Sequence, residues 1–312
     1  MSVRALHPAS KARIVRSQHI SVCVCTFKRP QLLAELLRRL EHQETEGQFT
    51  YSVVVADNDD RKTAEETVIG FSDHADLPVR YCVQPEQNIA LARNTALDHA
   101  TGNFIAFIDD DEFPDQDWLL SLFQACSKFG ADGVLGPVKP HFEVDPPLWV
   151  KKGKFFDRPV FATGFRVPWP ATRTGNVLFK RNILDGVDMP FSSQFDAAGE
   201  DVDFFRRMIQ RGYSFVWCDE AVVYEHVPES RCRRRYLLRR ALLRGSSFPK
   251  QSAHRVRNAI KSVIAVPCYT LALPVLALAG HHVFLKYLIK LFDHASRLCA
   301  LLGLPLVTQR ET

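Results

Sequence analysis

The strongest constraint in this sequence is an alternation, from Ile20 to Asp111, between short apolar runs and segments of helical periodicity. The predicted strands are 20–25, 52–56, 79–83 and 103–108. Helical segments follow the first three strands, beginning at Pro30, near Lys62 and at Asn88. This alternation is typical of βαβ units, which place parallel strands in one sheet between layers of helices. The sequence therefore predicts an α/β fold whose mostly parallel sheet has a nucleotide-sized crevice at the carboxyl ends of its strands.

The second half of this region continues with less regular patterns. A helix is predicted around 118–126, a strand at 176–180, a helix at 200–211 and two last short strands at 213–217 and 221–224. Between them, residues 136–174 are rich in proline, aromatic and basic residues and lack clear periodicity. We expect this stretch to form loops that cover the site.

Composition excludes several classes of protein. With 46% hydrophobic and 24% charged residues, the 312-residue chain is not wholly disordered, collagenous or a polytopic membrane protein. The net charge of +5 is too small to indicate nucleic acid as a partner, and none is expected. Eight cysteines without a C-x-x-C pair favour reduced thiols in a cytosolic setting, and residues 1–19 lack the apolar segment of a secretory signal.

The C-terminal quarter differs in composition from the rest. Ten basic residues and one acidic residue lie between Glu229 and Arg257, and no Asp, Glu, Lys, Arg or His occurs from Ser262 to Gly280. We expect a 1–19 extension, a 20–228 catalytic domain, a 229–260 basic helical linker and 261–312 apolar, membrane-associated helices. The apolar stretch is just long enough to span a bilayer, but Pro267 and Pro274 would break or kink it. A spanning, re-entrant or interfacial arrangement, or a helical hairpin packed on the catalytic domain, all remain open.

Four consecutive carboxylates, Asp109 to Glu112, follow the buried fourth strand. Like charges about 4 Å apart repel by roughly 4 kcal/mol at an effective dielectric of 20, so a cation is expected there. If the chain continues extended, Asp109 and Asp111 face one divalent ion while Asp110 points elsewhere. Oxygen ligands favour Mg²⁺ or Mn²⁺. The alternatives are a solvated acidic turn and a phosphatase D-x-D motif, although that motif follows the first strand of its fold.

Polar residues at two other strand or helix ends are further candidates. Asp57 could accept from a base N–H with Asn58 supporting it, or both could serve as a turn or helix cap. We expect Asn88 at a helix start and Arg93 beyond its first turn, an arrangement that suits binding of a nucleotide or diphosphate. Alternatively, Asn88 only caps the helix and Arg93 is exposed to solvent. No G-x-G-x-x-G or G-K-[ST] motif occurs, so dinucleotide and P-loop binding are not indicated.

Two sites near the end of the predicted domain could take part in chemistry. Glu200 and Asp201 open a helix whose positive end favours an ionised carboxylate, as a base for a hydroxyl proton requires, or they are ordinary helix-start acids. His226, expected after a strand that ends at Tyr224-Glu225, could bind metal or phosphate or be structural.

Taken in order, a set of motifs resembles family 2 glycosyltransferases with the GT-A fold. They are T-F-K-R-P, V-V-A-D-N-D, E-Q-N-I-A-L-A-R-N, F-I-D-D-D-E, G-N-V-L-F and G-E-D-V-D-F-F-R-R. The resemblance covers about residues 20–227. The motif sequences are most similar to those of bacterial glucosyltransferases of succinoglycan-type exopolysaccharide assembly. The Q-x-x-R-W motif of processive synthases is absent, since 231–236 reads R-C-R-R-R-Y, which favours addition of one sugar per acceptor.

The resemblance implies a role for each candidate residue. It places Thr26, Arg29 and Asp57 around a uracil-type base, Arg93 and Asp109 at the nucleotide, Asp111 on the metal, Asp201 as catalytic base and Glu200 on the acceptor. Asn58, Asn88 and Asp110 complete the expected nucleotide-binding set, and His226 matches a metal ligand of some relatives only.

The implied reaction is an inverting, metal-dependent transfer. The expected donor is UDP-glucose or a related UDP-hexose, and the expected acceptor is a saccharide on a polyprenyl diphosphate at the cytoplasmic face of the inner membrane. Two other classes stay open. A sugar-nucleotide-forming nucleotidyltransferase would need a glycine-rich loop after the first strand, and residues 25–30 contain no glycine. A non-catalytic membrane-bound binding protein would not explain why carboxylates occur at three separate strand or helix ends.

Overall fold

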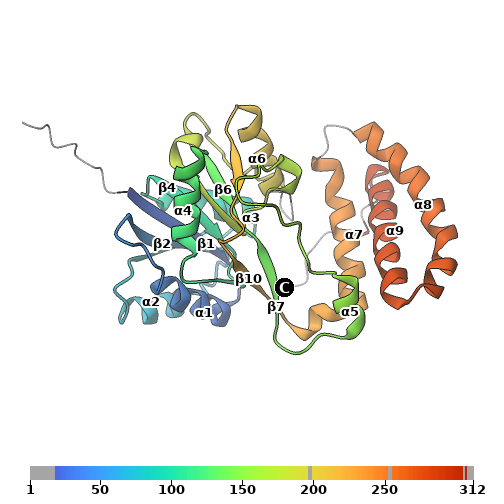
Figure 1. The fold of residues 1–312 in the computed structure, drawn as a ribbon, viewed down its shortest axis with the longest axis horizontal. Coiled ribbons are helices and arrows are strands. Elements are labelled where there is room, and N and C mark those ends of the chain that lie inside the picture. The colour runs from blue at the N-terminus through green and yellow to red at the C-terminus, as the bar shows by residue number, and fades with distance from the viewer. Residues whose placement is uncertain (1–17, 196–198, 252–254, 305, 308–312) are drawn as a thin grey trace, which may run out of the picture.

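A computed structural model describes residues 18–195, 199–251, 255–304 and 306–307 of the protein. These residues form two β-sheets with flanking helices and a C-terminal layer of three long helices (Figure 1). The expected 1–19 extension lies almost wholly outside the described residues.

The larger sheet has seven strands in the order β3-β2-β1-β4-β8-β6-β9. Its members are β1 (Gln18–Thr26), β2 (Phe49–Asp57), β3 (Val79–Val83), β4 (Phe104–Ile108), β6 (Gly133–Leu135), β8 (Asn176–Lys180) and β9 (Phe215–Trp217). The first four are mutually parallel, β8 is antiparallel to both neighbours, and β6 pairs with β9 in parallel. The predicted α/β fold with a mostly parallel sheet is therefore confirmed.

Successive residues of the central strands face two separate cores. On one side Val22, Val24 and Val53 pack with α1 (Pro30–Glu41), α2 (Glu65–Ser72) and α4 (Trp118–Phe129). On the other side Cys23 and Val54 pack with α3 (Ile89–His99) and α6 (Glu200–Gln210). Burial on both faces explains why these strands are continuous apolar runs without alternation.

A small sheet of β5 (Glu112–Pro114), β10 (Val223–Val227) and β7 (Val138–Phe142) lies beside the large one. The expectation that 136–174 is all loop is therefore wrong, since it holds β7, α5 (Leu148–Gly153) and the short helix η1 (Trp169–Ala171). The sequence of β7, VKPHF, has little apolar character, and its pairing partner β10 comes more than 80 residues later in the chain. His226 is also inside β10 rather than after a strand.

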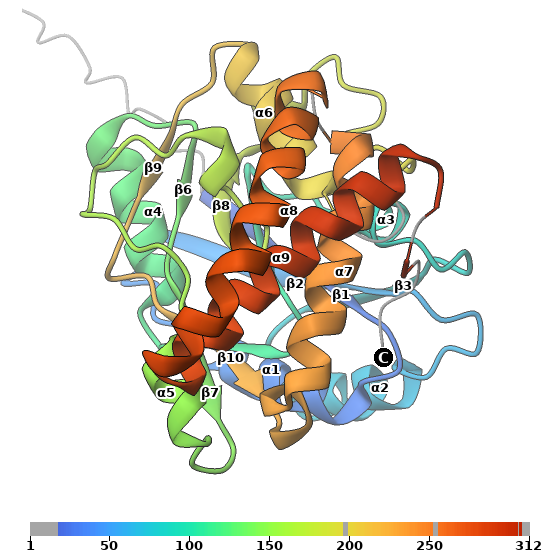
Figure 2. The same cartoon turned by 90° about the vertical axis from the view of Figure 1, so that its right-hand side faces the viewer.

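The C-terminal helices are α7 (Arg234–Gln251), α8 (Arg255–Leu278) and α9 (His281–Leu301), joined to the domain through η3 (Glu229–Cys232). The expected boundary between 260 and 261 falls within α8, which continues through Pro267 and Pro274 without ending. Figures 1 and 2 show α8 on the outside of this layer, away from the sheets. Within the described part of the chain, Val256–Leu278 is the one helix long and apolar enough to cross a membrane.

Candidate active site

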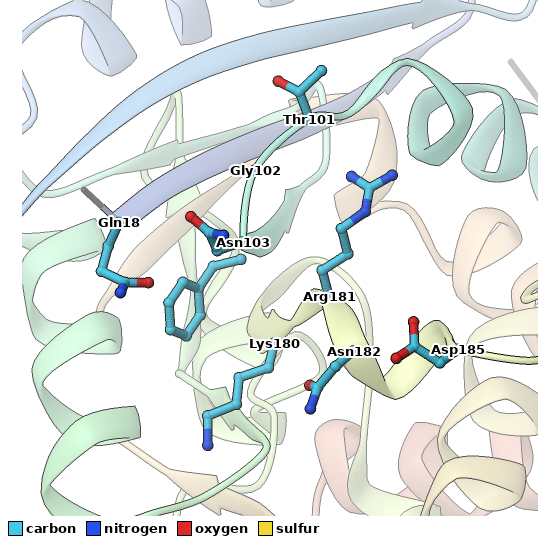
Figure 3. Close-up of a pocket in the computed structure, with 9 residues that line it drawn as sticks. Gln18, Thr101, Gly102, Asn103, Lys180, Arg181, Asn182 and Asp185 are labelled. Atoms are coloured by element: carbon cyan, nitrogen blue, oxygen red, sulfur yellow. The ribbon is translucent and has the colours of Figure 1, made fainter. Parts of the chain in front are cut away.

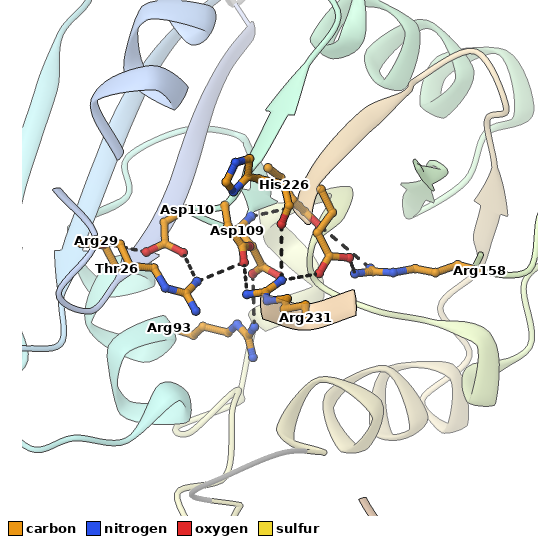
Figure 4. A network of polar contacts seen from close by, with 11 residues as sticks. Thr26, Arg29, Arg93, Asp109, Asp110, Arg158, His226 and Arg231 are labelled. Carbon is orange, nitrogen blue, oxygen red and sulfur yellow. Dashed lines mark hydrogen bonds and ion pairs between the residues drawn. The ribbon is translucent and has the colours of Figure 1, made fainter. Parts of the chain in front are cut away.

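The predicted site residues gather at the carboxyl edge of the large sheet. Strand register brings the ends of β1, β2 and β3 together, because Thr26 pairs with Asp57 and Asp57 with Val83. The acidic segment 109–112 follows β4, the neighbour of β1 on its other side. Figure 4 shows Thr26 at the end of β1 and Asp109 and Asp110 after β4 with their side chains in one network of polar contacts.

The acidic segment is a turn, not the extended continuation that the sequence analysis expected. The Glu112 amide donates to the Asp109 carbonyl over 3.1 Å, which closes the turn. As a result Asp110 and Asp111 share Arg29, at 3.0 and 3.1 Å, while Asp109 faces Arg93 at 3.7 Å. The expected pairing of Asp109 with Asp111, and separation of Asp110, is therefore wrong.

Asp110 is held on the side of the first strand. The Thr26 hydroxyl donates to its Oδ2 over 2.8 Å, and Arg29 binds its Oδ1. Burial raises the pKa of Asp110 to about 6, although Arg29 opposes that rise. Thr26 and Arg29, predicted to contact a base, are thus engaged with the acidic turn in this structure.

Two arginines outside the predicted site residues complete the network. Arg231, in η3, donates to Asp111 Oδ2 over 2.8 Å and contacts Glu225 at 3.1 Å. Arg158 reaches Glu225 at 2.5 Å and Glu112 at 3.9 Å. The cation expected beside the four carboxylates is supplied here by arginine side chains from four distant segments. Only the general enrichment of 136–174 and 229–257 in basic residues could have indicated them.

Glu200 and Asp201 open α6 after Gly199, whose positive φ of 105° suits glycine. The Glu200 carboxylate is buried and pairs with buried Arg93. Burial lowers the pKa of Arg93, but Glu200 and Asp109 outweigh it and raise that pKa overall, so the guanidinium stays charged. Asp201 is less buried and accepts from the Val202 amide over 2.7 Å. The helix start and the nucleotide edge are therefore joined through Arg93.

Three of the predicted nucleotide-binding residues form hydrogen bonds within the protein itself: Asp57, Asn58 and Asn88. Buried Asp57 accepts from the Tyr81 hydroxyl over 2.8 Å and from the Ala64 amide over 2.9 Å. Asn58 donates to the carbonyls of Gln84 and Glu86. Asn88 caps α3 by accepting from the Ala90 and Leu91 amides, and it donates to the Ser193 carbonyl. These bonds fix the loops that border the crevice.

The residues around Asp111 fit a divalent cation by donor type. His226 is adjacent through its backbone amide, which donates to the Asp111 carbonyl over 2.8 Å, while its Nε2 lies 2.7 Å from Glu143. Glu112 Oε1 is buried and accepts no hydrogen bond from the described residues, although Arg158 lies 3.9 Å from it. Carboxylate oxygens in excess, one of them without a donor, suit Mg²⁺ or Mn²⁺. No group of three His, Cys, Asp or Glu in the described ranges is already gathered as ligands.

Gly175 and Asn176, in the G-N-V-L-F motif, support the acidic turn from β8. A Cβ on Gly175 would lie 2.7 Å from Glu112 Oε1 and 3.1 Å from Asp109 Oδ2, so only glycine fits without movement. Buried Asn176 accepts from the Trp118 indole over 2.8 Å and donates to the carbonyls of Pro137 and Ala221. The sequence indicated that this motif matters, but it did not predict these contacts.

A separate hollow of about 420 Å³ lies at the opposite edge of the sheet (Figure 3). Its lining residues include Gln18 at the start of β1, Asn103 and Phe104 at the start of β4, and Lys180 at the end of β8. None of the predicted site residues lines it. We therefore place the site at the arginine-carboxylate network, where the candidate residues meet.

Comparison with known proteins agrees with this architecture. Residues 21–192, more than half of the chain, match the family model for Glycosyl transferase family 2. The chain belongs to this family. It is therefore a glycosyltransferase, as the motifs indicated.

This family 2 glycosyltransferase is 34% identical over 303 residues to the succinoglycan biosynthesis protein ExoM of Rhizobium meliloti, covering 93% of the chain and 95% of ExoM. Glycosyltransferase AglE of Haloferax volcanii is 23% identical over 203 residues, 65% of each chain.

Solved structures share the GT-A fold. The mannosyltransferase PcManGT from Pyrobaculum calidifontis, in complex with GDP-Man and Mn²⁺, superposes with a TM-score of 0.60 at 22% identity, covering 93% of this chain and 87% of that one. S. aureus TarS in complex with UDP-GlcNAc gives a TM-score of 0.51 at 20% identity, covering 67% and 58%. The predicted GT-A fold is confirmed.

Proposed function

We propose that this glycosyltransferase transfers a hexose from a UDP-sugar, UDP-glucose by preference, to a hydroxyl of a lipid-linked saccharide in exopolysaccharide synthesis. The observation that carries the proposal is the arrangement of Arg29, Arg93 and Arg231 around the acidic turn. Guanidinium groups bind diphosphates well, and carboxylates beside them suit the cation that a diphosphate brings. The extent of the similarity to ExoM supports the exopolysaccharide context.

Asp201 is the proposed catalytic base. Its place at the first turn of α6 favours the ionised carboxylate, which can take the proton of an acceptor hydroxyl. That oxygen then forms a bond to the anomeric carbon as the bond from this carbon to the diphosphate breaks, and UDP leaves. Glu200, through its ion pair with Arg93, orients this end of the helix toward the acceptor.

Asp111, with His226 beside it, would hold Mg²⁺ or Mn²⁺. When bound, the cation would neutralise charge that develops on the departing diphosphate. Arg29 and Arg231 then turn from Asp111 to phosphate oxygens. Thr26, Arg29, Asp57 and Asn58 border the proposed base and ribose pocket, with Asn88, Asp109 and Asp110 on its nucleotide side.

The proposed acceptor is a saccharide on a polyprenyl diphosphate, which places the enzyme at the cytoplasmic face of the plasma membrane. The exposed apolar helix α8 and the basic helix α7 of the same C-terminal layer support this location. We propose residues 20–228 as the catalytic domain and the helices after it as the membrane-associated part.

A panel of donors tests the proposal. The full chain is incubated with UDP-glucose, UDP-galactose, UDP-GlcNAc and GDP-mannose in Mn²⁺, and release of nucleoside diphosphate is measured with and without membrane extract as acceptor source. We expect turnover with UDP-hexoses and its loss in chelator. The variant Asp201→Asn tests the proposed base. We expect it to bind UDP normally but to transfer the sugar about 10²–10⁴-fold more slowly. Turnover with GDP-mannose alone would contradict the donor, and full activity of Asp201→Asn would contradict the base.

A further inference from the structure

The outer face of α8 is a continuous apolar stripe. We call it the α8 stripe, and its exposed large members are Val256, Ile260, Val263, Ile264, Leu271, Val275 and Leu278. Their spacing keeps them on one side of a helix of 3.6 residues per turn. At the amino end Arg257 and Lys261 are exposed and border the stripe. In the described part of the chain nothing packs over it, and Figure 1 shows helix α8 at the outer side of the molecule.

The inner face of α8 is tied to α9 by a polar contact. The buried Ser262 hydroxyl lies 2.9 Å from His294 Nδ1, and Tyr269 packs on the rings of Tyr287 and His294. The layer of α7, α8 and α9 is therefore a packed unit, in which α8 is not free to leave its neighbour without breaking these contacts.

Polar and close contacts also join α9 to α7. Asp293 of α9 binds Arg244 of α7 at 3.1 Å and Arg297 at 2.5 Å, and Ser296 donates to the Leu242 carbonyl over 2.6 Å. A Cβ on Gly245 would lie 2.5 Å from the Asp293 carbonyl, so the two helices touch closely. Charged groups thus lie inside this layer, one helix away from the α8 stripe.

This packing argues against α8 as a membrane span. Only residues 279 and 280 separate α8 from α9, so a spanning α8 would carry α9 back through the bilayer. The α9 helix contains Lys286, Lys290, Asp293 and Arg297, and each costs about 2.5–3.5 kcal/mol at the bilayer centre. That cost exceeds what the apolar stripe could offset alone.

The two prolines of α8 also argue against a membrane span. Pro267 and Pro274 lie on the exposed side of α8 and have no N–H for the carbonyls of Val263 and Thr270. Carbonyls left without a donor are unfavourable in the hydrocarbon core but are hydrated at the headgroup level. A helix lying in the plane of the interface enters only about 5–10 Å, to the headgroup–acyl boundary, so these carbonyls stay closer to water than they would at the centre of a span.

We propose that α8 binds an anionic bilayer lengthwise, with the α8 stripe in the interface and without crossing it. The inference rests on the membrane location in the proposed function and deepens it. Arg257 and Lys261 contact lipid phosphates at one end of the stripe. The catalytic domain, α7 and α9 then all stay on one side of the membrane, and the enzyme is monotopic.

Vesicle sedimentation tests the surface with matched variants. Ile264 on the stripe and Ile69 on α2 are 58% and 55% exposed, so Ile264→Asp and Ile69→Asp make the same change at similar exposure. With phosphatidylcholine vesicles containing phosphatidylglycerol, we expect Ile264→Asp to weaken binding at least tenfold and Ile69→Asp to leave it unchanged. Equal effects would overturn the proposal, as would a change from dimer to monomer in Ile264→Asp with vesicle binding intact. UDP affinity, measured in parallel, tests the transferase separately.

Cysteine labelling tests the orientation. In a Cys268→Ser background, Ala279→Cys marks the turn between α8 and α9, and Ser72→Cys marks the catalytic domain. We expect a membrane-impermeant maleimide to label both positions in inside-out vesicles and neither in right-side-out ones. Labelling of Ala279→Cys from the face opposite to Ser72→Cys would show a span and overturn the monotopic arrangement.

Discussion

Single arginine side chains balance the charge of the acidic turn. Asp111 Oδ2 accepts from both Arg29 and Arg231, so one carboxylate oxygen already has two cationic neighbours. The divalent ion proposed on Asp111 would have to displace them, and the freed guanidiniums would then be available to a diphosphate. In the proposed site the same arginines would therefore oppose cation binding alone and favour binding of the cation together with the nucleotide.

This balance gives a prediction for Arg231→Gln. We expect UDP affinity in Mn²⁺ to fall about tenfold or more, because a charge-assisted hydrogen bond contributes about 1.5–3 kcal/mol. Uridine affinity should change little, and nucleotide-free protein should bind Mn²⁺ more tightly than the wild type. Calorimetry and Mn²⁺ electron paramagnetic resonance measure these quantities. Arg211→Gln is the control, because Arg211 lies at the exposed end of α6, and equal losses for UDP and uridine would contradict the assignment.

Thiol reactivity gives a second prediction at this scale. Burial raises the pKa of Cys25 to about 12, with Arg93 opposing, whereas Cys268 is exposed on α8. Since the thiolate is the reactive form, only about one Cys25 in 10⁴ is reactive at pH 8, and reactivity rises as the pH increases toward 12. Mass spectrometry after brief alkylation at pH 8 should find Cys268 modified and Cys25 intact, with all eight cysteines modified after denaturation. Comparable early labelling of Cys25 would contradict its raised pKa.

Residue-level prediction from the sequence succeeded where chemistry is local. Asn88 was a candidate helix cap, and its side chain accepts from the first amides of α3. It failed where the partner comes from elsewhere in the chain: Arg231 and Arg158 reach the acidic turn because β10 and the 154–168 segment return to it. Periodicity and spacing carry no information about such long-range contacts.

At the scale of elements, the strands that the sequence predicts well are those buried on both faces of the sheet. β4 and the carboxyl-terminal parts of β1 and β2 are mostly buried, and their continuous apolar runs made them predictable. β7 could not be predicted, because two of its five residues are exposed and it is a strand only through pairing with β10. The acidic turn differed from expectation for a related reason, since β5 begins at Glu112 in the other sheet and the chain turns before it.

The start of β8 gives a prediction about how the elements are joined. Asn176→Ala removes one acceptor and two donors that satisfy Trp118, Pro137 and Ala221. We expect the free energy of unfolding to fall by about 2–4 kcal/mol, because buried polar groups without partners are costly. Urea denaturation followed by tryptophan fluorescence measures this. Asn103→Ala, at an exposed asparagine bonded to the His19 amide, should cost less than about 1 kcal/mol, and similar losses would refute the structural role.

At the scale of the whole molecule, the C-terminal helices are part of the fold as well as the proposed membrane surface. A small apolar core joins Val150 of α5, Val227 of β10, Leu237 of α7 and Leu285 of α9. Composition separated this region from the catalytic domain, because apolar and basic residues gather there. It could not show that α9 packs back onto α7 and α5, since that depends on contacts far apart in the chain.

The last prediction compares removal of these helices with a change to their outer face. A chain ending at residue 254 loses α8 and α9 and exposes Leu237, whereas Ile264→Asp leaves the core cluster intact. We expect the shortened chain to unfold at a lower temperature and to bind UDP more weakly, because α7 then no longer holds η3, which carries Arg231 to Asp111. Ile264→Asp should keep the wild-type melting temperature and UDP affinity while losing vesicle binding. Differential scanning calorimetry and UDP titration check both chains. Wild-type stability and UDP affinity in the shortened chain would show instead that the helices are a separable anchor.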